Sequence, residues 1–95
     1  MASYLVIDIE VKDDKAYEPY RAGVGPIIQK HGGEYLVRGG PVEVVEGTWK
    51  PSRVVVLRFP DRKSLDGFLN DPAYTPLKEI RQRATRSDIV AVDGV

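Results

Sequence analysis

The chain has 95 residues, the size of one small domain, and its 14 basic residues balance 14 acidic ones, so the formal net charge is zero. Without a basic surplus it has no electrostatic footprint for nucleic acid or an anionic membrane surface, and we expect it to bind neither. It contains no cysteine, which excludes disulfides, thiolate nucleophiles and cysteine-bound metals, so packing alone must hold a single domain over residues 1–95.

The alternation of residues 4–11 predicts a strand with apolar side chains on both of its faces. One side of the alternation is apolar and the other is half apolar: Leu5, Ile7, Ile9 and Val11 against Tyr4, Val6, Asp8 and Glu10. The N-terminus, MASYLVIDIE, lacks the features of a signal peptide and of a membrane span. We therefore expect a cytoplasmic protein.

A helix is predicted next, with Asp13 or Asp14 as its cap. It carries a stripe of residues at three- and four-residue spacing that should face the sheet: Tyr17, Tyr20, Val24, Ile27 and His31. Pro19 and Pro26 interrupt the pattern, because an internal proline removes one backbone hydrogen bond and clashes with the preceding turn. We expect either one kinked helix or two shorter ones.

Glycines end this helix and bound a short strand. Gly32-Gly33 supplies the left-handed conformation that a helix C-terminus favours, and residues 34–38 form the strand. Gly39-Gly40-Pro41 breaks it, and residues 42–46 should continue as an extended arm with its tip at residues 47–51. Residues 53–59, RVVVLRF, predict a central strand because they are almost continuously apolar.

Two further helices precede the last strand. Pro60-Asp61 starts the first, whose narrow apolar face ends at residues 70–72, and Thr75-Pro76 caps and opens the second. Residues 87–92 form the final strand. The order β-α-β-β-α-β, with one extra short helix, predicts an α+β fold of the ferredoxin-like type with an antiparallel four-stranded sheet.

That fold leaves one sheet face without helices. The expected uncovered side chains are Tyr4, Val6, Val54 and Val56, with Val90 and Val92 or their neighbours from the last strand. Burying four to six such side chains at about 1.5–3 kcal/mol each contributes roughly 6–18 kcal/mol, comparable to the whole net stability of a domain. We therefore expect a homodimer that packs sheet to sheet through this face.

Two charged residues interrupt the same face. Asp8 and Arg58 are expected at comparable heights on adjacent strands, within reach of each other. One interpretation is a functional cluster in which the carboxylate moves a proton and the arginine holds an anionic oxygen. The other is a structural ion pair.

His31 and Arg38 each allow two interpretations. His31 is the only histidine, so it is the first candidate for acid–base chemistry, although a histidine at a helix C-terminus also serves as a cap. Arg38 ends a strand beside the glycine break, where its guanidinium suits a carboxylate or phosphate. It is equally placed to pair with Glu34 or Glu46.

Two aromatic residues are the remaining candidate site residues, and the sequence contains no cofactor-binding motif. Trp49, at the tip of the arm, either reaches the partner subunit or packs on its own, and Tyr74 is expected at a pocket mouth. Neither a dinucleotide-binding nor a phosphate-loop pattern is present. The only adjacent carboxylates, Asp13-Asp14, suit a helix cap better than a metal, so we expect neither a cofactor nor a metal site.

Several motifs resemble the domain-of-unknown-function family numbered thirteen-thirty: YLVRGG with the preceding HGG, VEVVEGTW, RVVVLRFP, and PAYTPL followed by Arg81. The resemblance covers nearly the whole chain. Residues typical of that family are Gly32, Gly33, Arg38, Gly39, Gly40, Gly47, Trp49 and Tyr74. The sequence FLND at 68–71 departs from it, since many members have an aromatic pair there.

The resemblance implies a dimeric α/β barrel in which two ferredoxin-like subunits face each other through their sheets. That superfamily includes cofactor-free monooxygenases, muconolactone isomerase, haem-dependent peroxidases and ligand-sensing domains of regulators, so fold does not fix function. The family itself implies no activity and no catalytic residues. A regulator's sensing domain is disfavoured because no DNA-binding segment is present.

Together these features predict a small-molecule pocket for an anionic or aromatic ligand, lined by Asp8, His31, Arg38, Trp49, Arg58 and Tyr74. One hypothesis is a cofactor-free enzyme, monooxygenase- or isomerase-like. The alternative is a ligand-binding or accessory dimer without catalysis, in which the same residues fix the dimer. The sequence assigns neither a substrate nor a reaction, and whether the protein is an enzyme stays open.

Overall fold

Four strands and three helices follow one another along the chain in the order expected of a ferredoxin-like fold with one extra helix. The structure, a computed structural model, describes residues 1–95. The elements are β1 (Ser3–Val11), α1 (Asp14–Lys30), β2 (Glu34–Arg38), β3 (Val54–Phe59), α2 (Arg62–Leu69), α3 (Thr75–Ala84) and β4 (Thr85–Asp93). The predicted fold class is confirmed, and most element ends lie within two residues of those expected.

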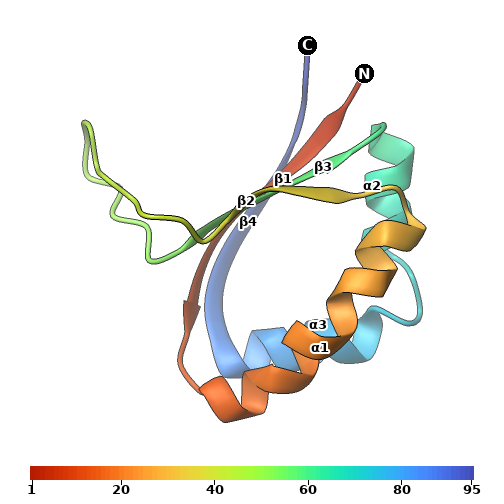
Figure 1. Cartoon of the computed structure of the whole chain (residues 1–95), viewed down its shortest axis with the longest axis horizontal. Helices are drawn as coiled ribbons and strands as arrows, with labels where there is room; N and C mark the ends of the chain where they lie inside the picture. The colour runs from red at the N-terminus through yellow and green to blue at the C-terminus, as the bar shows by residue number, and fades with distance from the viewer.

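The sheet is antiparallel, in the order β2-β3-β1-β4, so β1 and β3 occupy its centre as predicted. Leu5 lies opposite Leu57, and Ile7 lies opposite Val55. Because cross-strand partners point to the same face, these apolar pairs form one continuous surface. All three helices lie on that side of the sheet, and the two chain termini lie close together (Figure 1).

α1 is one continuous helix that contains both prolines, so the alternative of two shorter helices is excluded. The carboxylate of Asp13 caps its start by accepting the backbone N–H of Ala16 at 3.0 Å. Gly32 ends it with a φ of 76°, which costs glycine little but strains other residues. The chain then turns directly into β2.

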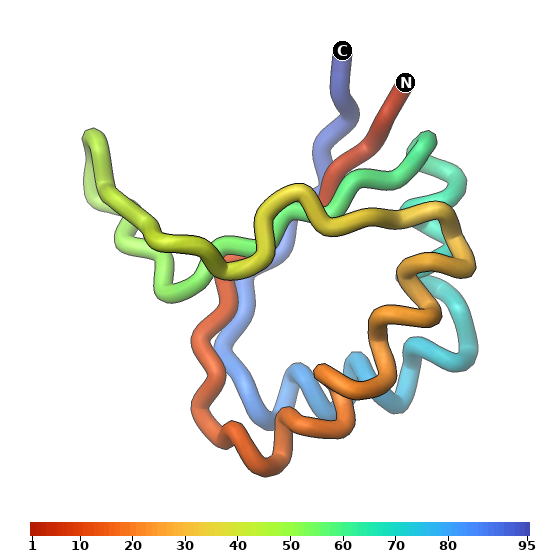
Figure 2. The backbone as a smooth tube through the Cα atoms, in the orientation of Figure 1, coloured from red at the N-terminus to blue at the C-terminus, as the bar shows by residue number.

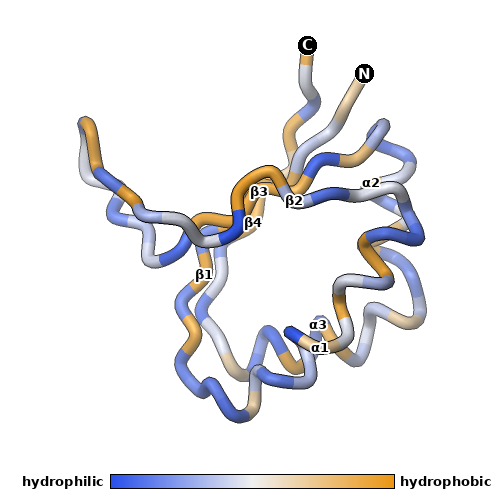
Figure 3. The backbone as a smooth tube through the Cα atoms, viewed as in Figure 1, coloured by the Kyte–Doolittle hydropathy of each residue, from blue (hydrophilic) through white to orange (hydrophobic).

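The core lies between the helices and the centre of the sheet. Its buried members are Leu5, Leu57 and Phe59 from the strands, with Val24, Ile28, Leu65, Phe68 and Tyr74 from the helical side. Figure 3 shows hydrophobic segments concentrated along the strands and recurring along α1. The spacing of these residues matches the two-residue period of strands and the 3.6-residue period of helices.

The start of α3 differs from the prediction. Its N-cap is Tyr74, no side chain caps it, and Thr75 is already its first residue. Pro76 still fits the first turn, because the missing N–H of proline has no partner inside the helix there. None of the three helices has the length and apolarity needed to cross a membrane.

Residues 39–53 form an arm without helix or strand, which leaves the sheet on the side away from the helices (Figure 2). No helix covers the sheet face on that side (Figure 1). Val90 and Val92, both on β4, are 59% and 50% exposed. The uncovered apolar face expected from the alternation is therefore present in the isolated chain.

Candidate functional site

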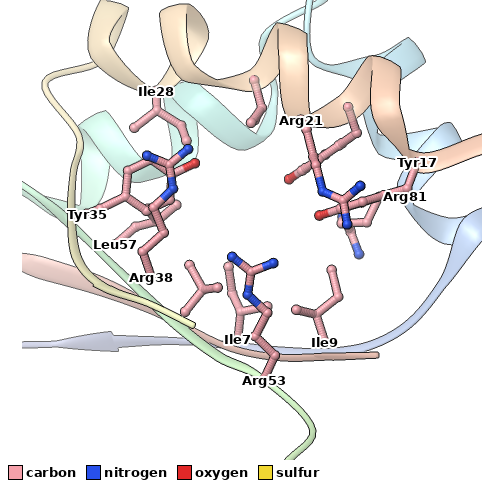
Figure 4. A pocket seen from close by; sticks show the side chains of 13 residues that line it. Ile7, Ile9, Tyr17, Arg21, Ile28, Tyr35, Arg38, Arg53, Leu57 and Arg81 are labelled. Atoms are coloured by element: carbon pink, nitrogen blue, oxygen red, sulfur yellow. The ribbon is translucent and has the colours of Figure 1, made fainter. Parts of the chain in front are cut away.

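A cavity of about 130 Å³ lies between α1 and the helix-covered face of the sheet (Figure 4). Its floor comes from strand side chains, and its roof from one side of α1. Thirteen residues line it: Ile7, Ile9, Tyr17, Tyr20, Arg21, Val24, Ile28, Tyr35, Arg38, Arg53, Val55, Leu57 and Arg81. The ionisable groups of this lining are arginines and tyrosines.

Arg38 reaches this cavity because β2 contains a bulge. Tyr35 pairs with Leu57, but two residues later Val37 already pairs with Val56, so one extra residue stands between them. Arg38 then lies opposite Val55 on the helix-covered face, where strict alternation would have placed it on the other side. Its guanidinium sits over the ring of Tyr35, 4.3 Å from the ring centre.

Arg53 enters the cavity from the residue before β3. It passes so close to Gly39 that a Cβ at that position would overlap the guanidinium. Gly39 also has a φ of 72°, so both its backbone and its contact with Arg53 favour glycine. The Nε of Arg53 is buried and has no hydrogen-bond partner.

Arg81 enters from α3, at the other end of the cavity from Arg38 (Figure 4). Its residue is 7% exposed, and its Nη1 donates to the hydroxyl of Ser87 at 2.6 Å. Its Nε is buried without a partner. A buried guanidinium with an unused donor is costly unless an anion or water supplies the missing acceptor.

The four arginines of the lining differ in how their charges are compensated. Arg21 forms ion pairs with Asp14 at 2.9 Å and Glu18 at 3.3 Å, which compensate its charge. No carboxylate lies within salt-bridge distance of the other three, which are Arg38, Arg53 and Arg81. Three uncompensated positive charges therefore surround one small, mostly apolar cavity, and such an enclosure concentrates a positive potential.

Tyrosine rings form the aromatic part of the cavity wall. The rings of Tyr17 and Tyr20 stack with their centres 5.0 Å apart on α1. Burial raises the pKa of the Tyr17 hydroxyl, while the nearby charges of Arg53 and Arg21 oppose that rise. Tyr17 therefore stays a neutral hydroxyl that can donate to an anion.

Asp8 and Arg58 do not meet, so the expected cluster is wrong. Arg58 lies opposite Tyr4, four residues or about 13 Å along β1 from Asp8. It pairs instead with Glu34 on β2 at 3.3 Å. The face was predicted correctly, but position along the strand depends on the register, which alternation does not specify.

Asp8 binds the arm instead. Its carboxylate accepts the backbone N–H of Ser52 at 2.9 Å and the indole N–H of Trp49 at 3.2 Å, and Arg86 lies 3.5 Å away. Burial opposes its ionisation, but these hydrogen bonds and the positive charge outweigh it and lower the pKa of Asp8. An ionised carboxylate fully engaged in this way has a structural role.

His31 is also outside the cavity. It is the C-cap residue of α1, as the structural interpretation expected, and its Nε2 lies 2.8 Å from Asp71. Asp71 in turn accepts the backbone N–H of Ala73 and the ammonium of Lys30. His31 is thus part of an ion-pair cluster that joins α1 to the segment between α2 and α3.

The two aromatic candidates lie elsewhere as well. Trp49 is 58% exposed while its indole N–H binds Asp8 of its own subunit, and its ring lines a shallow groove with Val6 and Val54 on the uncovered face. Tyr74 is 2% exposed and packs against Phe68 in the core, so its expected position at a pocket mouth is wrong. It lies behind the cavity wall, with its hydroxyl 3.4 Å from that of Tyr20.

Of the six predicted site residues, only Arg38 lines the cavity, and two of its arginine neighbours were missed as site residues. A signal for both was present. Arg53 lies two residues before Val55, so in a strand both side chains point to the same face. Arg81 lies four residues after Leu77 and three before Ala84, so in a helix the three side chains share one face. An arginine in phase with an apolar stripe points inward, and needs a partner there.

No group of three or more histidine, cysteine or carboxylate side chains is arranged to hold a metal ion. The donors that face the cavity are guanidinium and hydroxyl groups, which bind anions through charge-assisted hydrogen bonds.

Comparisons with known proteins agree with this fold. The family model described as Domain of unknown function (DUF1330) matches residues 2–95. No curated protein matches the chain. A protein of unknown function from Rhodopseudomonas palustris has a similar structure, with a TM-score of 0.81 and 17% identity over 99% of this chain and 82% of that one.

Two further solved structures are similar at lower identity. A dimeric ferredoxin-like protein of unknown function from Jannaschia sp. has a TM-score of 0.71 and 14% identity, over 99% of this chain and 100% of that one. SnoaB, a cofactor-independent oxygenase from Streptomyces nogalater, has a TM-score of 0.65 and 12% identity, over 99% and 93%. At these identities the likeness concerns the fold.

Proposed function

Since the chain belongs to the DUF1330 family, whose function is unknown, we propose from its site that it binds a small organic anion in the cavity between α1 and the sheet. The observation that carries this proposal is the set of three arginines without carboxylate partners, Arg38, Arg53 and Arg81, around one apolar enclosure. An anion there would satisfy the unpartnered donors of Arg53 and Arg81.

The size of the cavity limits the ligand. An apolar cavity of about 150 Å³ accepts a molecule as large as benzene. The present cavity, at about 130 Å³, suits a ligand whose buried carbon skeleton is no larger than that. A carboxylate on such a skeleton matches the planar guanidinium groups of Arg38 and Arg53, which can bind it through two parallel hydrogen bonds.

The proposal is tested by titrating the protein with benzoate in a buffer of low chloride content, using calorimetry or NMR. We expect saturable binding of one benzoate per chain, no binding of the neutral analogue benzamide, and a loss of roughly tenfold or more in affinity in Arg53→Gln. The control is Arg83→Gln, which removes an exposed arginine of α3 that does not line the cavity. Equal binding of benzamide, or no saturable binding of benzoate, would contradict the proposal.

Catalysis without a cofactor is the second candidate function. Its support is the placement of the Tyr17 hydroxyl beside positively charged groups, which would stabilise an enolate or phenolate form of a bound anion. The known oxygenase of similar fold adds a reason to test it. Oxygen consumption or substrate deuterium exchange with carboxylates that bind would reveal it, and Tyr17→Phe should abolish turnover while leaving most of the affinity.

The assembly we propose is a homodimer that packs through the uncovered sheet face. Its support is the apolar character of that face, where Val90 and Val92 are at least half exposed in the single chain. In such a dimer the cavity opens on the opposite side of the sheet, so one ligand per chain is expected.

A further inference from the structure

The three uncompensated arginines of the cavity are spread along it. Figure 4 shows Arg38 on one side of the cavity together with Tyr35, Arg81 on the other side near Tyr17, and Arg53 rising between them. Apolar side chains accompany them, with Ile7 beside Arg53 and Leu57 beside Tyr35 at the Arg38 end. A ligand that fills the cavity therefore meets a positive group at each end, with Arg53 and apolar side chains between them.

A single carboxylate cannot compensate the positive charges of all three arginines in the site. One carboxylate at Arg38 would leave Arg81, which is 7% exposed, with its buried Nε still unpartnered. A carboxylate at Arg81 would leave Arg38 and part of the charge of Arg53 uncompensated. Arg81 is buried and needs a paired anion, whereas the exposed Arg38 offers a second charge-assisted contact, so a ligand with two negative groups uses this site better than a ligand with one.

The side chain of Arg53 acts toward both ends of the cavity. It passes against Gly39, next to Arg38, and its charge also acts on the hydroxyl of Tyr17 at the Arg81 end. A guanidinium has five N–H donors in a fixed plane, so it can serve two acceptors on different sides.

We propose that the ligand of this cavity is a small dicarboxylic acid, held with one carboxylate at Arg38 and the other at Arg81, with Arg53 contacting the ligand between them. This inference rests on the proposed function and narrows it to a class of ligand. The cavity volume limits the chain between the carboxylates to a few carbon atoms, roughly two to four.

The test compares each diacid with its own half-amide, which keeps the shape and loses one charge. Succinate, glutarate and adipate are titrated against succinamate, glutaramate and adipamate by calorimetry. We expect at least one diacid to bind about tenfold more tightly than its half-amide, because it gains a second charge-assisted contact. Inorganic phosphate, whose charge is concentrated at one point, should bind more weakly than that diacid.

Arginine variants locate the two contacts. Arg38→Gln should remove most of the advantage of the diacid, and so should Arg81→Gln, while Arg83→Gln should leave it unchanged. If Arg81→Gln does not fold, Arg38→Gln alone still decides the matter, because Arg38 is exposed at a strand end and its side chain forms no hydrogen bond or ion pair within the chain.

Two outcomes overturn the inference in different ways. If every half-amide binds as well as its diacid, or if phosphate binds as tightly as the best diacid, the ligand is held at one point only, and the proposed anion-binding function still stands. If neither diacids, half-amides nor benzoate bind saturably, the proposed function itself is wrong and the inference falls with it.

Discussion

Single carboxylates hold distant segments of this small domain together, and Asp71 shows how. It lies between α2 and α3, is 6% exposed, and accepts from His31, Lys30 and the backbone of Ala73. The hydrogen bond with His31 makes the largest contribution to lowering the pKa of Asp71, followed by those from Ala73 and Lys30. All of these contacts favour the ionised form.

Asp71 should therefore make the folded state sensitive to acid. Because its pKa is lower in the folded state than in the unfolded state, its contribution to stability is complete above the unfolded value of about 3.9 and is lost as the pH falls below it. We expect Asp71→Asn to be less stable than the parent at pH 7, and to lose less further stability between about pH 4 and pH 2.

Urea unfolding at several pH values measures this difference. Asp66→Asn is the matched control, since Asp66 is on the neighbouring α2 and makes only an exposed ion pair with Arg62. Parallel pH profiles of Asp71→Asn and the parent would show that the cluster around Asp71 does not contribute.

At the level of elements, backbone hydrogen bonds tie the two ends of the arm at residues 39–53 to the sheet, and between them one side chain of the sheet binds it. The carboxylate of Asp8, on β1, binds the arm at both Trp49 and Ser52. The arm has no helix or strand of its own, so few other hydrogen bonds hold it. Its position relative to the uncovered face depends on this attachment.

Asp8→Ala should release the arm while leaving the sheet intact. We expect the Ser52 amide and the indole N–H of Trp49 to exchange hydrogen about tenfold faster or more, because their hydrogen bonds to the carboxylate are lost. Trp49 is the only tryptophan, so its fluorescence reports the same change. Asp88→Ala is the control, because Asp88 lies directly opposite Asp8 on β4 and does not contact the arm.

Protection of the arm that is equal in Asp8→Ala and the parent would mean that other contacts hold it. If Asp88→Ala released the arm as well, the effect would come from the charge of Arg86, which contacts both carboxylates.

For the whole molecule, the main consequence of the fold is that one face of the sheet has no helix to cover it. Val90 and Val92 are exposed there, and no helix of the chain lies on that side (Figure 1). The proposed homodimer removes this surface from water, which stabilises a chain too short to bury a large core alone.

The dimer is tested by light scattering at micromolar concentration, where we expect twice the chain mass of 10.6 kDa. Val90→Asp should reduce the mass to that of a monomer, because a charge buried in the interface would lack a partner. Gln29→Asp, on the exposed side of α1, should leave the mass unchanged. A parent protein that is monomeric at this concentration would contradict the proposed assembly.

The sequence by itself determined the order of the elements, the central position of β1 and β3, the ends of most helices, and the apolar uncovered face. These features follow from local rules: the period of apolar residues, the caps at Asp13 and Gly32, and the breaks at glycine and proline. They depend on residues that are close together in the chain, so the sequence is sufficient to predict them.

Only the tertiary structure decided which polar residues meet. The bulge in β2 turned Arg38 toward the helices, the register separated Asp8 from Arg58, and packing of α3 brought Arg81 to the cavity. Each of these depends on how strands slide and helices pack over long sequence distances, where a shift of one residue reverses the direction of a side chain. The candidate site is therefore a property of the register and the packing, although its arginines were visible in the sequence.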